Sequence, residues 1–412
     1  MKFLTKIGIQ KSWIIVCFFN FLVASIMGLV MRFLYLFPLK NINYSYLLHG
    51  HSHVAMLGWT YLMLYVLIVH FFIPKDKRRK PIYNRLFWLT EFAVIGMMIA
   101  FPVQGYALFS ILFSVMHIVL SYVFCGLVWR DCCKGKRRDK KLLLGAILFM
   151  IFSTVGIWLL GPVISLAGKQ SIFYQIAIQF FLHFQFNGWF LFAVLALFLR
   201  QIKNEIEKEN SLLFFALLIA ATIATFAFPV SWYVKNNIVK CISGIGVVLQ
   251  FFAFVYFYKM LKSQISSFQA SLSSTTKMVY SLAIGSLFLK IIFQLMLLIP
   301  VLAESSHQIR GFVIGFIHLT TLGIITGFLF GILFQNKLIS DKSSFVRLGV
   351  KCFVFGYIIT EILLFLQGGF FYFNKGVLPW YYESIFITSA LIVLGLVLII
   401  VSELKIKKIR VD

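Results

Sequence analysis

His53-Val-Ala-Met-Leu-Gly58-Trp59 and His183-Phe-Gln-Phe-Asn-Gly188-Trp189 share one pattern, a histidine followed by glycine five positions later and then by tryptophan. A third copy, His318-Leu-Thr-Thr-Leu-Gly323, lacks the tryptophan. The three copies lie about one third of the 412-residue chain apart. Each histidine lies in a long apolar run, where an imidazole is costly unless it has a partner. The threefold register therefore predicts a metal or haem centre on the inner wall of a helical bundle.

The composition predicts an all-α integral membrane protein. Hydrophobic residues make up 61% of the chain and charged residues only 12%. The apolar runs are continuous and do not alternate, which excludes a β-barrel. The third run is short, and the break at Phe101-Pro102 and Gly105 leaves a kinked hairpin as the alternative. Twelve runs are expected to span as helices: 12–35, 46–72, 85–101, 106–129, 142–163, 173–199, 211–231, 238–260, 278–301, 308–335, 348–367 and 384–402.

The net charge of +25 is placed on one side of the predicted membrane. With the amino terminus inside, inward segments carry thirty Lys and Arg, outward segments carry seven, and one lysine lies within a helix. This is a strong positive-inside signal. It predicts a multi-pass protein of the cytoplasmic membrane with both termini cytoplasmic. The basic loops are expected to touch anionic lipid of the bilayer, and a nucleic-acid partner is not expected.

The chain reads as a single polytopic membrane domain over residues 1–412, with no soluble domain. The spacing of the histidines predicts quasi-repeats of four helices, at about 1–140, 141–275 and 276–412. Of the six cysteines, four lie in predicted helices and two in a cytoplasmic loop, so a disulfide framework is not expected. The chain has no Cys-x-x-Cys-His motif, which excludes covalent c-type haem attachment.

Four histidines are predicted at one depth. His53, His117, His183 and His318 lie on the second, fourth, sixth and tenth runs, all of which run from outside to inside. Counted from the expected helix starts, all four lie roughly 10–17 Å below the outer boundary. On two of these helices, further polar residues lie on the same face as the histidine. For His117 the alternative is a structural histidine, buried and hydrogen-bonded to a serine or a carbonyl. The further polar residues are Gln179 and Asn187 on the sixth helix, and Ser114 and Ser121 on the fourth.

Other residues have secondary predicted roles. At α-helical pitch the glycine five positions on lies about 140° from its histidine, so we expect it to serve helix packing. Intramembrane ionisable groups are candidates for a proton relay, with a purely structural role as the alternative. The relay candidates are Glu91, Glu361 and Lys290, and the residues expected at the outer surface are His49, His51, His307 and Arg310.

The placement of these histidines on the second, sixth and tenth helices resembles that in subunit I of the haem-copper oxidase superfamily and in the NnrS family of membrane haem-copper proteins. The segment His318-Leu-Thr-Thr-Leu-Gly is similar to the histidine-Thr-Gly stretch of NnrS proteins. The resemblance implies a twelve-helix bundle in pseudo-threefold arrangement. It further implies that His53 and His318 are the axial ligands of a haem and that His183 is a copper ligand.

The chain also departs from the oxidase pattern. The seventh run, residues 211–231, has no histidine, and His318 is alone at its depth on the tenth. Asn187 stands where the oxidases have a tyrosine. A complete oxygen-reducing centre is therefore not expected, which favours an NnrS-like relative. What is left is at most one bis-histidine haem, with His183 and His117 as candidate copper ligands.

The resulting expectation is a redox or nitric-oxide-related membrane protein. If it is an enzyme, it is an oxidoreductase of the haem-copper oxidase or nitric oxide reductase type, with a quinol or a cytochrome as electron donor. Two rivals stay open. One is a secondary transporter with a histidine-lined proton or metal pathway, although such proteins usually repeat in five or six helices. The other is a non-catalytic assembly subunit.

Overall fold

In the computed structural model, residues 9–132, 138–202 and 208–409 are described, and every regular element in them is helical. Twelve segments are long and apolar enough to cross a membrane, which confirms the polytopic all-α prediction. The oxidase-like arrangement and the orientation of the termini stay predictions. The segments are Lys11–Leu36, Tyr44–Phe72, Pro81–Gln104, Leu108–Asp131, Asp139–Ala167, Ile172–Gln201, Glu209–Ser231, Asn237–Lys262, Ser274–Met296, Arg310–Gln335, Ser344–Tyr372 and Tyr381–Lys405.

The third apolar run forms a full-length helix, α5 (Pro81–Gln104). Pro102 lies in its last turn, and the helix ends at Gly105, whose φ of 62° only glycine adopts readily. The next helix, α6 (Leu108–Asp131), starts three residues later. The alternative of a kinked hairpin within this run is therefore wrong, because the proline lies where the helix is about to end.

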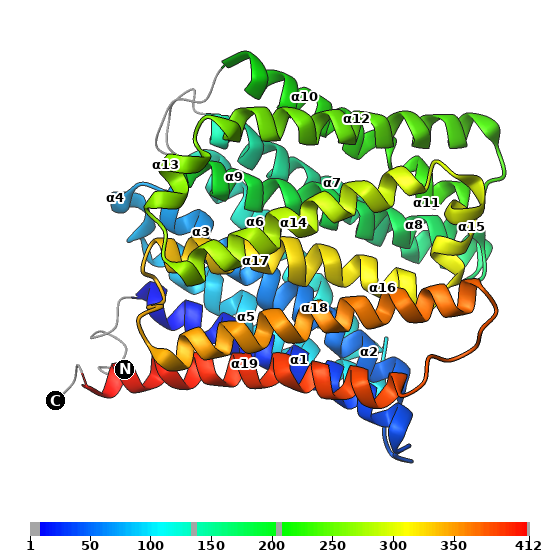
Figure 1. Cartoon of the computed structure of the whole chain (residues 1–412), viewed down its shortest axis with the longest axis horizontal. Helices are drawn as coiled ribbons and strands as arrows, with labels where there is room; N and C mark the ends of the chain where they lie inside the picture. Colours follow the sequence, from blue (N-terminus) through cyan, green and yellow to red (C-terminus); the bar gives the residue numbers. More distant parts are fainter. Residues whose placement is uncertain (1–8, 133–137, 203–207, 410–412) are drawn as a thin grey trace. The chain divides into compact units, whose positions relative to one another are not determined.

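The chain divides into two compact units, and the first comprises residues 1–134, 273–280 and 329–412. α18 and α19 pack along their length in this unit (Figure 1). A Cβ at Gly349 would lie 2.6 Å from the carbonyl oxygen of Gly395, so the two backbones touch there. Besides α5 and α6, the helices of this unit are α1 (Ile9–Leu36), α2 (Tyr44–His53), α3 (Leu62–Phe72), α4 (Lys75–Arg78), α18 (Ser344–Tyr372) and α19 (Tyr381–Ile409).

The second unit comprises residues 135–272 and 281–328. In this unit α7 packs on α8 and α9, and α10 packs on α12. The predicted four-helix quasi-repeats do not coincide with the two units and stay a prediction. The helices are α7 (Arg138–Ala167), α8 (Ile172–His183), α9 (Leu191–Gln201), α10 (Lys208–Ala224), α11 (Ala227–Ser231), α12 (Asn237–Lys262), α13 (Ile265–Ala270), α15 (Pro300–Gln308) and α16 (Arg310–His318), while α14 (Ser274–Met296) and α17 (Gly327–Gln335) belong to both units.

Candidate functional site

Each of the three repeated histidines is the last residue of an α-helix that continues directly as a π-helix. π-Helices are rare and occur frequently at functional sites. The repeated sequence pattern thus corresponds to a repeated change of helical geometry. The pairs are α2 with η1 (Val54–Tyr61) after His53, α8 with η2 (Phe184–Phe190) after His183, and α16 with η3 (Leu319–Thr326) after His318.

The glycines of the pattern lie inside these π-helical turns. A π-helix joins residues five apart by hydrogen bonds, so the glycine lies roughly one turn after its histidine and near the same side. The predicted offset of about 140°, which assumed α-helical pitch, is therefore wrong. The packing role agrees with the contacts. A Cβ at Gly58 would lie 2.9 Å from Cγ1 of Val94, and one at Gly188 would lie 2.7 Å from Cβ of Phe149.

His53 has one ring nitrogen that no described residue uses. Its Nδ1 lies 2.9 Å from the carbonyl oxygen of His49. Because a carbonyl only accepts, Nδ1 carries the proton and donates, which leaves the lone pair of the neutral ring on Nε2. Within the described part of the chain Nε2 makes no hydrogen bond. Phe101 stacks on the ring with 4.1 Å between centroids, and Tyr106 approaches it edge-on at 5.9 Å.

His117, on α6, lies in the same unit as His53. Its side chain is 3% exposed, and its Nε2 is buried without a hydrogen-bond partner among the described residues. The ring of Tyr61 meets it edge-on at 4.6 Å. His53 and His117 are close enough to interact electrostatically. The structure thus brings together two histidines for which the sequence predicted different roles.

The serines expected around His117 bond to their own helix. The hydroxyl of Ser114 donates to the carbonyl oxygen of Ser110 at 2.7 Å, and that of Ser121 donates to Ile118 at 2.6 Å. Such bonds to the preceding turn satisfy a hydroxyl inside an apolar helix. Neither serine hydrogen-bonds to His117 in the part of the chain that the structure describes.

His183 has partners at both ring nitrogens. Its Nε2 lies 2.8 Å from the carbonyl oxygen of Thr222 on α10, so Nε2 carries the proton and donates. Its Nδ1 then accepts from the amide Nδ2 of Asn187, at a longer 3.4 Å. Gln179, one turn before His183, lies near Tyr233 instead. Of the predicted polar row, only Asn187 therefore contacts this histidine by a hydrogen bond.

Lys290 lies near His183 in the second unit. Its side chain is completely buried, at 0% exposure. The ammonium donates to Oε1 of Gln294 at 2.9 Å and lies 5.5 Å from the ring centre of Phe316. It is close enough to His183 to interact electrostatically. Among the described residues no carboxylate forms an ion pair with it.

The two predicted relay carboxyls have different neighbours in the first unit. Nδ2 of Asn20 lies 2.7 Å from Oε2 of Glu91 and 3.2 Å from the carbonyl oxygen of Gly58, inside η1. Glu361 interacts electrostatically with Arg32. Asn20 carried no predicted role, although it is the lone amide side chain of the first apolar run. Asn20 satisfies a carbonyl of the π-helix and holds the carboxyl in place.

The four residues predicted at the outer surface differ in their surroundings. Nδ1 of His51 donates to the carbonyl oxygen of Ala24 at 2.8 Å, so this histidine ties α2 to α1. His49 lies 3.4 Å from the hydroxyl of Ser45. The other two are His307, whose ring stacks on Trp232 at 4.9 Å, and Arg310, which is exposed.

The donor set at His53 fits an axial haem ligand, whereas that at His183 does not fit copper. Metal-bound histidines usually donate their other ring N–H to a carbonyl, as His53 does. A metal at His183 would have to displace either the carbonyl of Thr222 or the amide of Asn187. No group of three or more His, Cys, Asp and Glu side chains in the described ranges is placed to hold a metal ion. The pairings of His53 with His318 and of His183 with His117 join different units and stay predictions.

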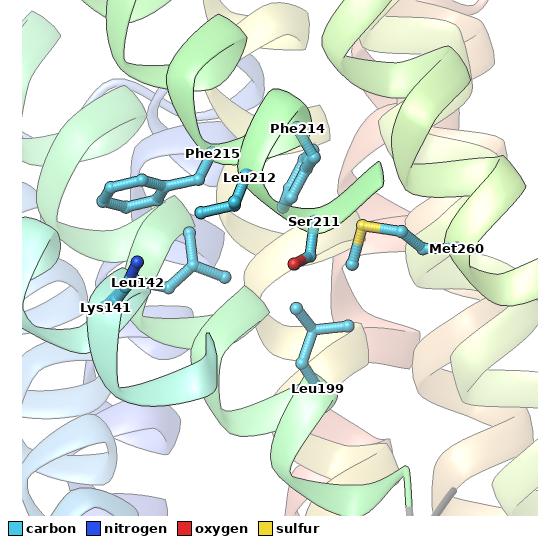
Figure 2. Close-up of a pocket in the computed structure, with 8 residues that line it drawn as sticks. All are labelled: Lys141, Leu142, Leu199, Ser211, Leu212, Phe214, Phe215 and Met260. Atoms are coloured by element: carbon cyan, nitrogen blue, oxygen red, sulfur yellow. The ribbon is translucent and has the colours of Figure 1, made fainter. Parts of the chain in front are cut away.

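A recess in the second unit holds none of the predicted site residues. It lies between α7, α9, α10 and α12 and is lined mainly by apolar side chains, with Lys141 and Ser211 as the polar ones (Figure 2). Its volume is about 20 Å³, which is room for about one water molecule. The recess is therefore too small for a haem or a quinol.

No protein-family model matches the chain, and no curated protein matches it in sequence. The resemblance to haem-copper oxidases stays a prediction from the motifs quoted above.

Proposed function

We propose that this protein is a haem-binding redox protein of the membrane, with His53 as an axial ligand of the iron. The observation that carries the proposal is the hydrogen bond from Nδ1 of His53 to the carbonyl oxygen of His49, at 2.9 Å. This bond fixes the tautomer and the orientation of the ring. It leaves the lone pair of Nε2 free for a metal ion, and neutral imidazole is a common haem ligand.

The surroundings of His53 support this role. Phe101 stacks on one face of the ring and limits its rotation, while Tyr106 covers an edge. An apolar shell excludes water, and that raises the cost of any charge change at the site. A bound haem supplies one-electron redox chemistry, and the protein residues orient it. His318, the last residue before η3, is also a haem ligand in this proposal.

The proposed reaction is electron transfer from a quinol or a cytochrome, or the handling of a diatomic such as nitric oxide. A complete oxygen-reducing centre does not belong to the proposal. An oxidase needs imidazoles free to bind copper near its second haem, and His183 has both ring nitrogens engaged. Because both ring nitrogens of His183 have partners, the proposal contains a single haem and no copper centre.

Absorption spectroscopy of the purified protein tests the proposal. We expect a Soret band that shifts on reduction with dithionite, and we expect His53→Ala and His318→Ala each to abolish it. His70→Ala, at the far end of the same membrane segment, is the matched control and retains the band. A colourless protein that stays colourless after addition of haem contradicts the proposal.

A secondary transporter is the second candidate, and one observation favours it. The carboxyl of Glu91 is buried, at 5% exposure, and lies with Asn20 against a π-helical carbonyl, a setting in which transporters place ion and proton sites. Proton flux into proteoliposomes, followed with a pH-sensitive dye, tests it. Flux that Glu91→Gln abolishes, in a protein that binds no haem, supports transport over redox chemistry.

A further inference from the structure

Lys290 is a completely buried lysine of the second unit, and no carboxylate among the described residues forms an ion pair with it. The described acidic residues of this unit lie near the ends of its membrane segments. Asp139 pairs with Arg200 at 2.9 Å, and Glu304 pairs with Lys235 at 3.3 Å. The remaining one, Glu209, lies in the first turn of α10. A buried charge without a partner is strongly unfavourable in a membrane, so Lys290 calls for a compensating group.

The neighbours of Lys290 supply more donors than acceptors. An ammonium has three N–H groups, and Gln294 accepts one of them through Oε1. The Nε2 group of Gln294 therefore lies close by, and it donates to no residue in the described ranges. The ring of Phe316 attracts the cation but brings no net charge. The remaining N–H groups of Lys290, the Nε2 group of Gln294 and the positive charge are together complementary to an anion.

His183 adds to this preference. Its Nε2–H is committed to the carbonyl of Thr222, and its Nδ1 faces the amide of Asn187. The ammonium of Lys290 lies within electrostatic range of the ring. In a low-dielectric interior, the positive charge of Lys290 strongly repels a metal cation bound at His183. The same field attracts an anion.

We propose that the polar interior of the second unit, at Lys290 and Gln294, binds a small inorganic anion and excludes copper. Because Lys290 is completely buried, the proposal is confined to small inorganic anions, for which bromide serves as the probe. The ammonium supplies the charge, and Nε2 of Gln294 supplies a second donor. The anion site does not rest on the haem proposal, because neither of its residues contributes to the His53 site.

Thermal unfolding in detergent, with sodium bromide exchanged for sodium gluconate at constant ionic strength, tests the anion site. Binding to the folded state stabilises it by mass action, so bromide raises the Tm of the wild type by a few degrees in a saturating manner. Lys290→Met removes the charge with little change of volume and abolishes the bromide dependence. Lys290→Arg keeps it. Lys169→Met, which changes an exposed loop lysine, is the matched control and leaves the dependence unchanged.

Gln294→Leu provides a second variant in case Lys290→Met does not fold, and we expect at least tenfold weaker bromide binding from it. No bromide dependence in the wild type overturns the proposal, because Lys290 is then a neutral amine. Equal dependence in Lys290→Met also overturns it. Metal analysis of the same preparations tests the exclusion of copper. One copper ion per chain that is lost in His183→Ala overturns that part.

Discussion

The segments around His53 and His183 share a sequence pattern and a backbone, but they differ in what they do with the imidazole. Both histidines end an α-helix that continues as a π-helix, and both glycines pack against a neighbouring helix. His53 donates to a carbonyl of its own helix and keeps Nε2 free, whereas His183 donates Nε2–H to Thr222 on another helix. The repeated pattern therefore sets the backbone, and the neighbouring helices decide whether the histidine is available to a ligand.

Positions within the pattern contribute to this difference. Four residues after the histidine, the first copy has Leu57 and the second has Asn187, whose amide contacts the imidazole. Two residues after the histidine, the first copy has Ala55, while Gln185 of the second donates to the hydroxyl of Ser153 at 2.9 Å. Polar side chains thus hydrogen-bond the second copy to its neighbours, and both ring nitrogens of His183, which a metal would need, are engaged.

The largest expected effect is on haem content. Of His53 and His183, only His53 has an Nε2 without a hydrogen-bond partner among the described residues. His53→Ala removes this imidazole, and haem per chain should fall at least about tenfold, because loss of even a group that only orients a metal ligand costs about 10–100-fold in metal affinity. His183→Ala should leave the haem content near the wild-type level, since His183 is engaged with Thr222 and Asn187. A pyridine haemochrome assay measures both. Equal loss in the two variants would remove the distinction between the two segments.

The glycines of the two segments are expected to be intolerant of a methyl group. Gly188→Ala brings a Cβ to 2.7 Å from that of Phe149, and Gly58→Ala brings one to 2.9 Å from Val94. Overpacking of this kind costs about 1–3 kcal/mol in the free energy of unfolding. Gly126→Ala is the matched control, because a Cβ there meets nothing within 4 Å. Unfolding measured in mixed micelles should rank the variants in this order, and a neutral Gly188→Ala would show that the neighbouring helix yields.

Asn20 is expected to matter only for the first segment. Asn20→Leu leaves the carbonyl of Gly58 and the carboxyl of Glu91 without their donor, at a cost of about 1–3 kcal/mol in the free energy of unfolding. Glu91→Gln is the control, since its amide oxygen still accepts from Asn20, and it should cost less free energy of unfolding than Asn20→Leu. The same micelle unfolding experiment measures both. A larger loss in Glu91→Gln than in Asn20→Leu would contradict this account.

The sequence predicts the fold far better than it predicts the site. The twelve segments follow from continuous apolar runs, because a helix that crosses a membrane must be apolar over its length. The α-to-π changes coincide with the repeated histidine–glycine pattern, but the pattern alone does not predict them, because they also depend on tertiary packing at Gly58 and Gly188. The partner of His183 is a backbone carbonyl, which every residue carries, so no sequence pattern reveals it. Asn20 was visible as a polar residue in an apolar run, but its contact with Glu91 is set by helix packing.

The smallest expected effect comes from making the second segment more like the first at the position of Leu57. Asn187→Leu removes a long hydrogen bond of 3.4 Å and also removes Oδ1, which is buried without a partner among the described residues. Loss of a weak bond and relief of an unsatisfied acceptor nearly cancel, so the free energy of unfolding should change by less than about 1 kcal/mol. Haem content should not change, because His183 still donates to Thr222. If Asn187→Leu instead costs as much as Asn20→Leu, the amide is a principal support of η2, and the two segments are held by equally strong polar contacts.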